Sequence, residues 1–125
     1  MVEEKKYSKD HEWIQLKDDI ATIGITNHAQ ESLGDIVFVD LPSVGNKVQS
    51  DGEVCVIESV KAASDIFSPV DGEIIEVNEA LKDNGSIVNE DPENKGWIFK
   101  IKISDSTQFD RLMTLSEYEN FLKNE

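Results

Sequence analysis

The apolar residues of this chain fall in short runs that are separated by glycine, proline and charged residues. The longest uninterrupted runs are Ile36 to Val39 and Val54 to Ile57, with four residues each. A transmembrane helix needs about 20 consecutive apolar residues, so these runs predict no membrane span. Short β-branched runs bounded by turn residues are typical of strands, and their repetition along the chain predicts a mainly β fold.

The clearest pair of strands lies within about residues 52–73. Val54 to Ile57 forms one apolar run, and Ile66-Phe67 resumes the pattern after a short polar break. A strand, a short break and a second strand predict a β-hairpin. Lys61 lies near the apex beside two alanines, so its amine is expected to be exposed and reachable. The alternative interpretation is an ordinary surface lysine, which keeps sheets soluble and apart.

Alternation and capping signals place the elements before the hairpin. Residues 5–10 are polar and are expected to lead into a strand at 11–16, which pairs with a second strand at 20–25. Thr26 is a suitable N-cap for a short helix over 27–33, which Gly34 can end. The segment 35–41 is largely apolar and is therefore expected to be a central strand.

The second half begins with strands and ends with helices. Residues 97–103 alternate between apolar side chains and lysines, which predicts a strand with one wet face. A helical segment over about residues 105–124 follows, in which Thr114 and Glu117 form a capping box. The apolar stripe of the last helix is expected to pack on its own domain; its members are Leu115, Tyr118, Phe121 and Leu122.

A weak internal repeat suggests two similar halves. Gly45 precedes Val48 by three residues, as Gly85 precedes Val88, and an apolar strand follows each pair. Glycines at matched places suggest matched turns. Two halves of short strands can wrap into a flattened barrel or sandwich, and the length of 125 residues predicts one domain. Chance similarity in a Gly- and Val-rich chain is the alternative.

The charge of the chain limits its partners. The formal net charge is −14, from 26 acidic and 12 basic residues. Binding to nucleic acid depends on Lys and Arg neutralising phosphates, and anionic membranes also attract basic residues, so both partners are disfavoured. The acidity favours proteins with basic docking surfaces. It is equally consistent with a role in solubility alone.

No catalytic or metal-binding signature stands out. A Ser-His-Asp set, a P-loop, a dinucleotide fingerprint and His-rich metal spacing are all missing from the sequence. Cys55 is the single cysteine, so the chain can form no internal disulfide, and its place in an apolar run predicts a buried thiol. His11 and His28 are expected to be packing residues. We therefore expect no enzyme activity and no metal site.

The N-terminus, Met1 to Lys6, lacks the apolar segment of a signal peptide and the Arg-rich composition of a transit peptide. The expected location is therefore the cytoplasm. A mitochondrial matrix protein whose presequence has been removed is the alternative.

One stretch closely resembles a known modification site. Residues 58–65, Glu-Ser-Val-Lys-Ala-Ala-Ser-Asp, resemble the lipoylation site of the glycine cleavage H-protein family. Further similar stretches cover nearly the whole chain, namely 6–7, 11–13, 21–30, 33–37, 41–42, 68–69, 72–78, 87–89 and 96–97. Biotin carriers have a Met on each side of the lysine, where this chain has Val60 and Ala62. Lipoyl domains of 2-oxoacid dehydrogenases share the hairpin but lack the His-Glu-Trp opening and the long C-terminal tail.

The resemblance implies a fold and a role. The fold would be a flattened barrel/sandwich hybrid of lipoyl/biotinyl-carrier type, with an N-terminal β extension, a short internal helix and C-terminal helices. The chain would be a non-catalytic carrier with lipoate in amide linkage to Lys61, installed by a lipoyl/octanoyl transferase or a lipoate ligase. It would take an aminomethyl group from glycine decarboxylase (P protein) to the aminomethyltransferase (T protein). Dihydrolipoyl dehydrogenase (L protein) would reoxidise the dithiol.

A loaded arm would carry an amine that water can release. A carboxylate in a sheltered cleft would slow this loss through a charge-assisted hydrogen bond. We hypothesise that Glu12 is the main holder, because the neighbouring Trp13 could wall a cleft, and that Asp65 assists. The alternative for Glu12 is an ordinary strand-edge acid. The acids around the lysine, Glu53, Glu58, Asp65 and Asp71, are candidates for a docking surface or for a solvated rim.

Two other functions stay open from the sequence. The same lysine would serve a relay protein that supplies lipoyl or octanoyl groups to other lipoyl-dependent enzymes. In a different class, the chain would be an unmodified acidic β adaptor.

Overall fold

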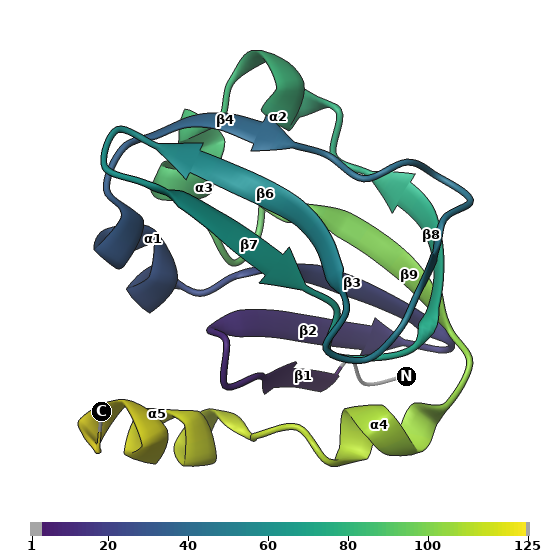
Figure 1. Cartoon of the computed structure of the whole chain (residues 1–125). Coiled ribbons are helices and arrows are strands. Elements are labelled where there is room, and N and C mark those ends of the chain that lie inside the picture. Colours follow the sequence, from purple (N-terminus) through teal and green to yellow (C-terminus); the bar gives the residue numbers. More distant parts are fainter. Residues whose placement is uncertain (1–3, 125) are drawn as a thin grey trace.

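The strands of this protein pair into two antiparallel sheets. The computed structural model describes residues 4–124 (Figure 1). The six-stranded sheet has the order β1 (Glu4–Tyr7), β2 (Glu12–Lys17), β3 (Ile20–Ile25), β9 (Phe99–Ile103), β8 (Gly72–Val77), β5 (Lys47–Val48). The three-stranded sheet has the order β4 (Ile36–Asp40), β6 (Glu53–Ser59), β7 (Ala63–Phe67). The fold is therefore mainly β, with two sheets that do not close into a barrel.

Five short helices connect or flank the sheets over the described residues. They are α1 (Asn27–Leu33), α2 (Ala80–Asp83), α3 (Ser86–Glu90), α4 (Ser106–Asp110) and α5 (Leu115–Lys123). The cap of α1 is the one that the sequence predicts, since the Thr26 side chain accepts a hydrogen bond from the Ala29 N–H. Gly34 ends this helix with a φ of 78°, a conformation that favours glycine. The predicted capping box of α5 is also confirmed, with Thr114 and Glu117 in reciprocal hydrogen bonds.

The main core lies between the two sheets. Alternate residues of the strands point inward from both sides, so that Ile23 and Phe99 of one sheet belong to the same buried cluster as Ile57 and Ile66 of the other. Cys55 is buried in this core, as predicted. Burial of each large apolar side chain contributes roughly 1.5–3 kcal/mol, so the shared core binds the sheets to each other.

A second cluster attaches the C-terminal helix. Tyr118 of α5 stacks on Tyr7 of β1 with ring centroids 4.8 Å apart, and the buried Trp13 of β2 belongs to the same cluster. The Trp13 ring lies so close to Gly24, its partner on β3, that a Cβ there would be 2.7 Å from the indole nitrogen. The predicted packing of the α5 stripe is therefore confirmed, except that Leu115 is exposed.

Two expectations about the strands are wrong. The segment 35–41 contains β4, which lies at the edge of the three-stranded sheet rather than at its centre. A β-bulge between Ile36 and Phe38 explains the misleading composition, because it leaves both Val37 and Phe38 exposed. Residues 5–10 are also more than a polar lead-in, since β1 pairs with β2 along its whole length.

The internal repeat does not extend to matched turns. Val48 lies in the strand β5, whereas Val88 lies in the helix α3, and neither α2 nor α3 is expected from the sequence. The backbone explains the difference: Gly45 has a φ of 97°, but Gly85 has a φ of −64°. The strand predicted at 97–103 is also shorter, because Trp97 and Ile98 precede β9.

None of the helices within residues 4–124 combines the length and the apolar composition that crossing a bilayer requires.

Candidate functional site

Lys61 lies at the tip of the β6–β7 hairpin, as the sequence predicts. The Ser59 N–H donates to the Ala62 carbonyl at 2.8 Å and closes the turn. The Ser59 hydroxyl braces the same turn, because it accepts from the N–H groups of Lys61 and Ala62 at 3.2 Å each. Val60, Lys61 and Ala62 are all exposed. The turn is therefore held by its backbone and by one serine, while the lysine amine is left in solvent.

The tip is seated on the segment that joins α1 to β4. The N–H of Val60 donates to the Asp35 carbonyl at 3.0 Å. The side chain of Asn89, on α3, holds this segment through two hydrogen bonds. Its Oδ1 accepts from the Ile36 N–H at 2.8 Å, and its Nδ2 donates to the Gly34 carbonyl at 2.8 Å. The hydrogen bond between Ile36 and Asn89, which lie 53 positions apart in the sequence, thereby helps to fix the position of the lysine. Sequence reasoning missed Asn89, because no local pattern relates it to the hairpin.

The methylene stem of Lys61 passes over Gly34. A Cβ at Gly34 would lie 3.3 Å from Lys61 Cε and 3.8 Å from Nζ. The missing side chain thus leaves a shallow path along which the lysine lies. The exposed amine and this path fit an acyl group on Nζ, because such a group displaces only solvent there.

Glu12 is the first residue of β2, and its side chain lies beside the opposite end of the hairpin, where β7 ends. Its carboxylate accepts from the Phe67 N–H at 2.8 Å and from the Ser8 hydroxyl at 3.0 Å. The residue is 1% exposed. Burial raises the pKa of Glu12 to about 8; the two hydrogen bonds oppose the rise, and the charges of Asp10 and Asp51 add to it. Glu12 is thus a buried acid that binds a proton near neutral pH, and not a strand-edge carboxylate.

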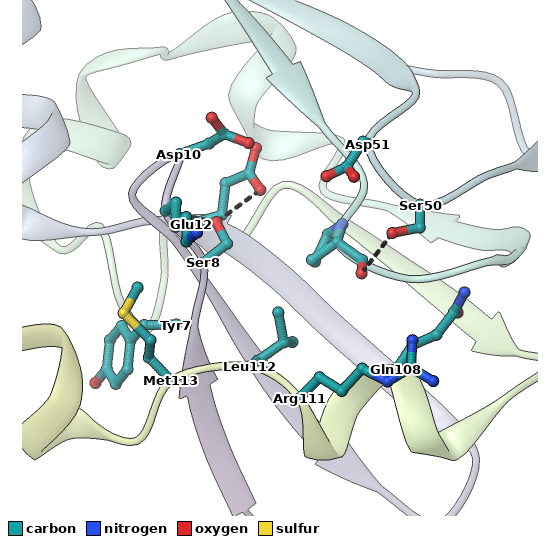
Figure 2. Close-up of a pocket in the computed structure, with 12 residues that line it drawn as sticks. Tyr7, Ser8, Asp10, Glu12, Ser50, Asp51, Gln108, Arg111, Leu112 and Met113 are labelled. Carbon is teal, nitrogen blue, oxygen red and sulfur yellow. Dashed lines mark hydrogen bonds between the residues drawn. The ribbon is translucent and has the colours of Figure 1, made fainter.

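Glu12 lines a cavity of about 320 Å³ at the base of the hairpin. Figure 2 shows the Asp10 and Glu12 side chains next to each other, with Asp51 facing them and Leu112 and Arg111 contributed by the C-terminal segment. The lining therefore combines three acids, Asp10, Glu12 and Asp51, with two cationic side chains, Lys9 and Arg111, and a few apolar residues. Its carboxyl groups can accept hydrogen bonds from a small group that carries an amine.

Trp13 does not wall this cavity, which corrects the reason given for Glu12. Consecutive strand residues point to opposite faces of a sheet, so Glu12 points into the cavity while Trp13 points into the second cluster. The aromatic residue of the lining is Tyr7 instead.

The structure does not gather the three candidate residues in one place. Lys61 lies at the tip of the hairpin, Asp65 on β7 with an exposed side chain, and Glu12 at the base. Asp65 is the third residue of β7, so at about 3.3 Å per strand residue it lies roughly 7 Å from the start of that strand. Asp65 does not line the cavity. Along β7, Asp65 lies between the turn that carries Lys61 and Phe67, whose N–H donates to Glu12.

The two histidines are neighbours, which the sequence did not predict. The rings of His11 and His28 have centroids 4.7 Å apart, and His11 Nδ1 lies 2.8 Å from the Tyr118 hydroxyl. Over residues 4–124, no group of three or more His, Cys, Asp or Glu side chains is arranged to hold a metal ion. The pair is thus part of the packing between α5 and the start of α1.

Known proteins share this arrangement over nearly the whole chain. The family model described as Glycine cleavage H-protein matches residues 5–125. The chain belongs to the glycine cleavage H-protein family. A Glycine cleavage system H protein of Thermotoga maritima is 50% identical over 121 residues, which cover 97% of this chain and 98% of the relative. One from Escherichia coli is 54% identical over 123 residues, covering 98% and 95% of the two chains.

A solved structure agrees with the fold. The crystal structure of a glycine cleavage system H protein from Mycobacterium marinum matches with a TM-score of 0.85 at 34% identity, and the match covers 98% of this chain and 99% of that chain. Membership of the H-protein family makes the chain a non-catalytic lipoyl carrier component of the glycine cleavage system. It also implies that other proteins of that system are its partners.

Replacement of Asn89 should loosen the seat of the lysine. In Asn89→Ala the Ile36 N–H loses its partner, so the free energy of unfolding should fall by about 1–3 kcal/mol. The N–H of Val60 should also exchange faster with solvent, because Asp35 is no longer held in place. Thermal unfolding and amide hydrogen exchange measure the two effects.

The matched control is Asn120→Ala, on the exposed face of α5. It should change the stability by less than about 0.5 kcal/mol and leave Val60 exchange unaltered. Equal Val60 exchange rates in Asn89→Ala and the wild type would contradict the seating role.

The buried Glu12 should make the stability depend on pH. Its pKa is raised in the folded state, so the folded protein holds a proton that the unfolded chain releases as the pH rises. The free energy of unfolding should therefore fall from about pH 5 to about pH 8 and then level off, with a loss on the order of 4 kcal/mol.

Glu12→Gln removes this ionisation while keeping an oxygen for the two donors. Urea unfolding should show that the free energy of unfolding of the variant, relative to that of the wild type, is higher at pH 9 than at pH 5. A difference between variant and wild type that is the same at both pH values would refute a raised pKa for Glu12.

Proposed function

We propose that this chain carries lipoate in amide linkage on Lys61. In this role it takes an aminomethyl group from glycine decarboxylase, presents it to the aminomethyltransferase, and returns the reduced dithiol to dihydrolipoyl dehydrogenase. The observation that supports the proposal most directly is the exposed Lys61 amine at a braced hairpin tip within an H-protein fold. When bound, a lipoyl group supplies two sulfur atoms that accept a carbon fragment and electrons.

The chain contributes position rather than chemistry. The hairpin holds Lys61 exposed at the surface of the protein, and four methylenes extend its reach. A tethered group meets each enzyme at a high effective concentration once the carrier is docked. We further propose that residues 1–125 act as one lipoyl-carrier domain, because both sheets share one core. The relatives in Thermotoga and Escherichia are bacterial proteins, which supports the cytoplasm as the compartment.

The cavity at the base of the hairpin is the proposed shelter for an amine. A neutral Glu12 would give its proton to a primary amine that enters the cavity, so the two become an ammonium and a carboxylate without net uptake of protons. The donors already in place, Ser8 and the Phe67 N–H, would stabilise the carboxylate. Asp65, on the path from Lys61, would assist by attracting the ammonium.

Intact mass tests the proposal about Lys61. Protein from cells supplied with lipoate should carry the mass increment of one lipoyl group, and Lys61→Arg should abolish it while leaving the thermal stability nearly unchanged, because Lys61 is exposed. Lys82→Arg, at another exposed lysine, is the control and should remain modified on Lys61. If the wild-type protein carries no lipoyl group, the proposal fails and the alternative of an unmodified acidic β adaptor remains. Reconstitution with each downstream enzyme distinguishes the glycine cleavage carrier from a lipoyl relay protein.

Because the cavity is proposed to shelter the amine, replacing Glu12 should shorten the lifetime of the protein that carries the aminomethyl group. Ammonia release from loaded Glu12→Gln should be severalfold faster than from the wild type, because a charge-assisted hydrogen bond is replaced by a neutral one. Asp65→Asn should have a smaller effect in the same direction, and Asp83→Asn, in the remote α2, should have none. Equal release rates in Glu12→Gln and the wild type would remove Glu12 from the proposal.

A further inference from the structure

Glu12 directly follows a residue with an unusual backbone conformation. His11 has a φ of 64°, in the left-handed region that is uncommon for residues other than glycine. It ends a tight turn in which the Ser8 N–H donates to the Glu12 carbonyl at 2.9 Å and the His11 N–H donates to the Ser8 carbonyl at 3.2 Å. Such a conformation persists only where the surrounding contacts hold it. The contacts of His11 therefore influence where the Glu12 carboxyl points.

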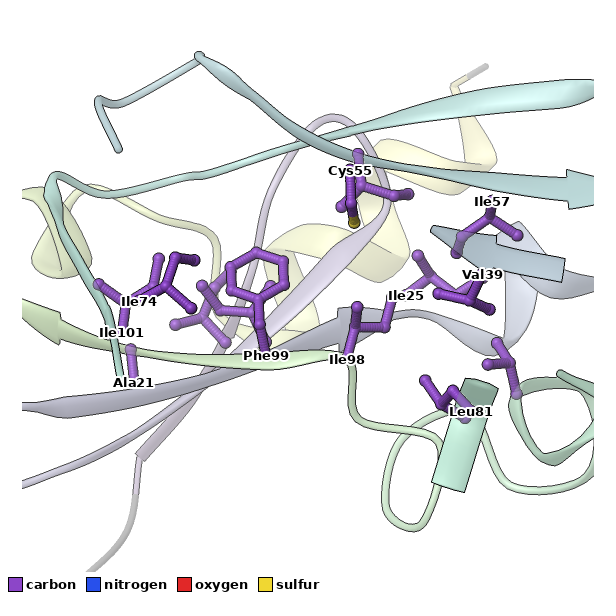
Figure 3. Packing of buried hydrophobic residues seen from close by; sticks show 14 of the residues in the cluster. Ala21, Ile25, Val39, Cys55, Ile57, Ile74, Leu81, Ile98, Phe99 and Ile101 are labelled. Carbon is purple, nitrogen blue, oxygen red and sulfur yellow. The ribbon is translucent and has the colours of Figure 1, made fainter. Parts of the chain in front are cut away.

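The main core holds this segment from one side only. Glu12 pairs with Ile25 in the β2–β3 register, and partners directly opposite each other lie on the same face of a sheet. Figure 3 shows Ile25 among the side chains of the main core. The ring of His11 instead contacts α5, with its centroid 5.7 Å from that of Tyr118 and 5.8 Å from that of Phe121. The helix α5 therefore supports the turn from the other side.

The hydroxyl of Tyr118 connects three segments of the chain. It lies 2.8 Å from His11 Nδ1 and 2.8 Å from the Thr26 hydroxyl, which is hydrogen-bond distance in both cases. Thr26 is the N-cap of α1, and its N–H donates to the His11 carbonyl at 2.9 Å. Tyr118 thus binds the side chain of His11 and also the residue that holds the His11 main chain.

Tyr118 is itself held firmly. Its side chain is 4% exposed, and its ring stacks on Tyr7 with an interplanar angle of 8°. Two backbone hydrogen bonds between Tyr7 and Met113, at 2.8 and 2.9 Å, fix the chain just before α5, which lies alongside β1 (Figure 1). The hydroxyl is therefore already in place for His11, and little conformational freedom is lost when the hydrogen bond forms.

We propose that Tyr118 is a positioning residue for the Glu12 carboxyl and acts on it through His11. The hydrogen bond between the hydroxyl and the ring keeps His11 in its left-handed conformation, and the turn then presents the Ser8 hydroxyl to Glu12. Without that hydroxyl, His11 relaxes toward negative φ, the turn opens and water reaches the carboxyl. The helix Leu115–Lys123 is thus part of the amine shelter, although none of its residues lines the cavity. This inference rests on the proposed role of Glu12.

The charged groups around Glu12 do not include Tyr118. Those that line the cavity with it are Lys9, Asp10, Asp51 and Arg111. Burial is the main cause of the raised pKa of Glu12, and the charges of Asp10 and Asp51 add to it. Tyr118→Phe leaves all of these charges in the chain. A change in the titration of Glu12 in this variant therefore reports its exposure to water and its hydrogen bonds, and not a lost charge.

Titration of the Glu12 carboxyl by carbon NMR, in the unmodified full-length chain, tests the inference. In the wild type the midpoint should lie near pH 8. Tyr118→Phe removes one oxygen and keeps the ring, so the midpoint should fall by about one pH unit or more as water enters. Ammonia release from the loaded variant should be severalfold faster than from the wild type. Thermal unfolding checks that each variant is folded at the temperature of the measurement.

Leu122→Ala is the matched control, because Leu122 packs in the same cluster as Tyr118. Loss of its side chain should lower the Tm but leave the midpoint of Glu12 and the release rate unchanged. Equal shifts in Leu122→Ala and Tyr118→Phe would reduce Tyr118 to general packing of α5 and overturn the inference. A wild-type midpoint in Tyr118→Phe would overturn it as well.

Substitutions at His11 test the route. His11→Ala should reproduce the shift of Tyr118→Phe, and the double variant should shift no further, because the two residues act in series. His11→Asn tolerates the left-handed conformation and offers a polar atom at the same distance along the side chain as Nδ1, so it should titrate nearly as the wild type does. Additive shifts in the double variant would contradict a route through His11.

The test separates this inference from the proposed function. If loaded Glu12→Gln releases ammonia at the wild-type rate, or if Lys61 is never acylated, the proposed function fails. The titration uses the unmodified chain, so it decides in either case whether Tyr118 positions Glu12.

Discussion

The position of Lys61 depends on the burial of the inner side of its own hairpin. Ile57 of β6 and Ile66 of β7 lie in the core between the sheets, where they belong to the same cluster as Phe99 of the opposite sheet. Each such side chain contributes roughly 1.5–3 kcal/mol when buried, so lifting the hairpin from the body would cost several times that amount. The hairpin is thus a rigid mount. Any movement of a group on Lys61 must come from the side chain.

The same hairpin connects the lysine to the buried acid. The turn at Lys61 is anchored to the α1–β4 segment, and the last strand residue, Phe67, donates its N–H to Glu12. The two ends of the hairpin therefore lie next to an exposed lysine and next to a sheltered polar pocket. Burial determines the chemistry of the pocket, because the carboxyl group of Glu12, removed from water, keeps its proton to a higher pH.

Local features of this fold could be predicted from the sequence, and features set by long-range contacts could not. The caps at Thr26 and Thr114 depend on neighbouring residues, and both are found as expected. The lysine hairpin is also local. The edge position of β4 depends instead on which strands pair, so the apolar run at 35–41 suggested a central strand, whereas β4 lies at the edge of its sheet.

The candidate site divides in the same way. Lys61 could be located because its exposure follows from a short turn. The burial of Glu12 follows from packing against the loop at Ser8 and the far end of β7, which no spacing in the sequence reveals. Asn89 was missed for the same reason, and Trp13 was assigned to the wrong face. Consecutive side chains on a strand diverge, so adjacency in the sequence was a poor guide to adjacency in space.

The single tip of the hairpin sets a limit on how enzymes can share this carrier. Val60, Lys61 and Ala62 form one small apex on a mount that does not swivel. Two enzymes cannot enclose the same apex at once, so visits must follow one another. Flux through such a system is governed by how quickly each complex dissociates, and a partner that binds too tightly slows the whole cycle as effectively as one that binds too weakly.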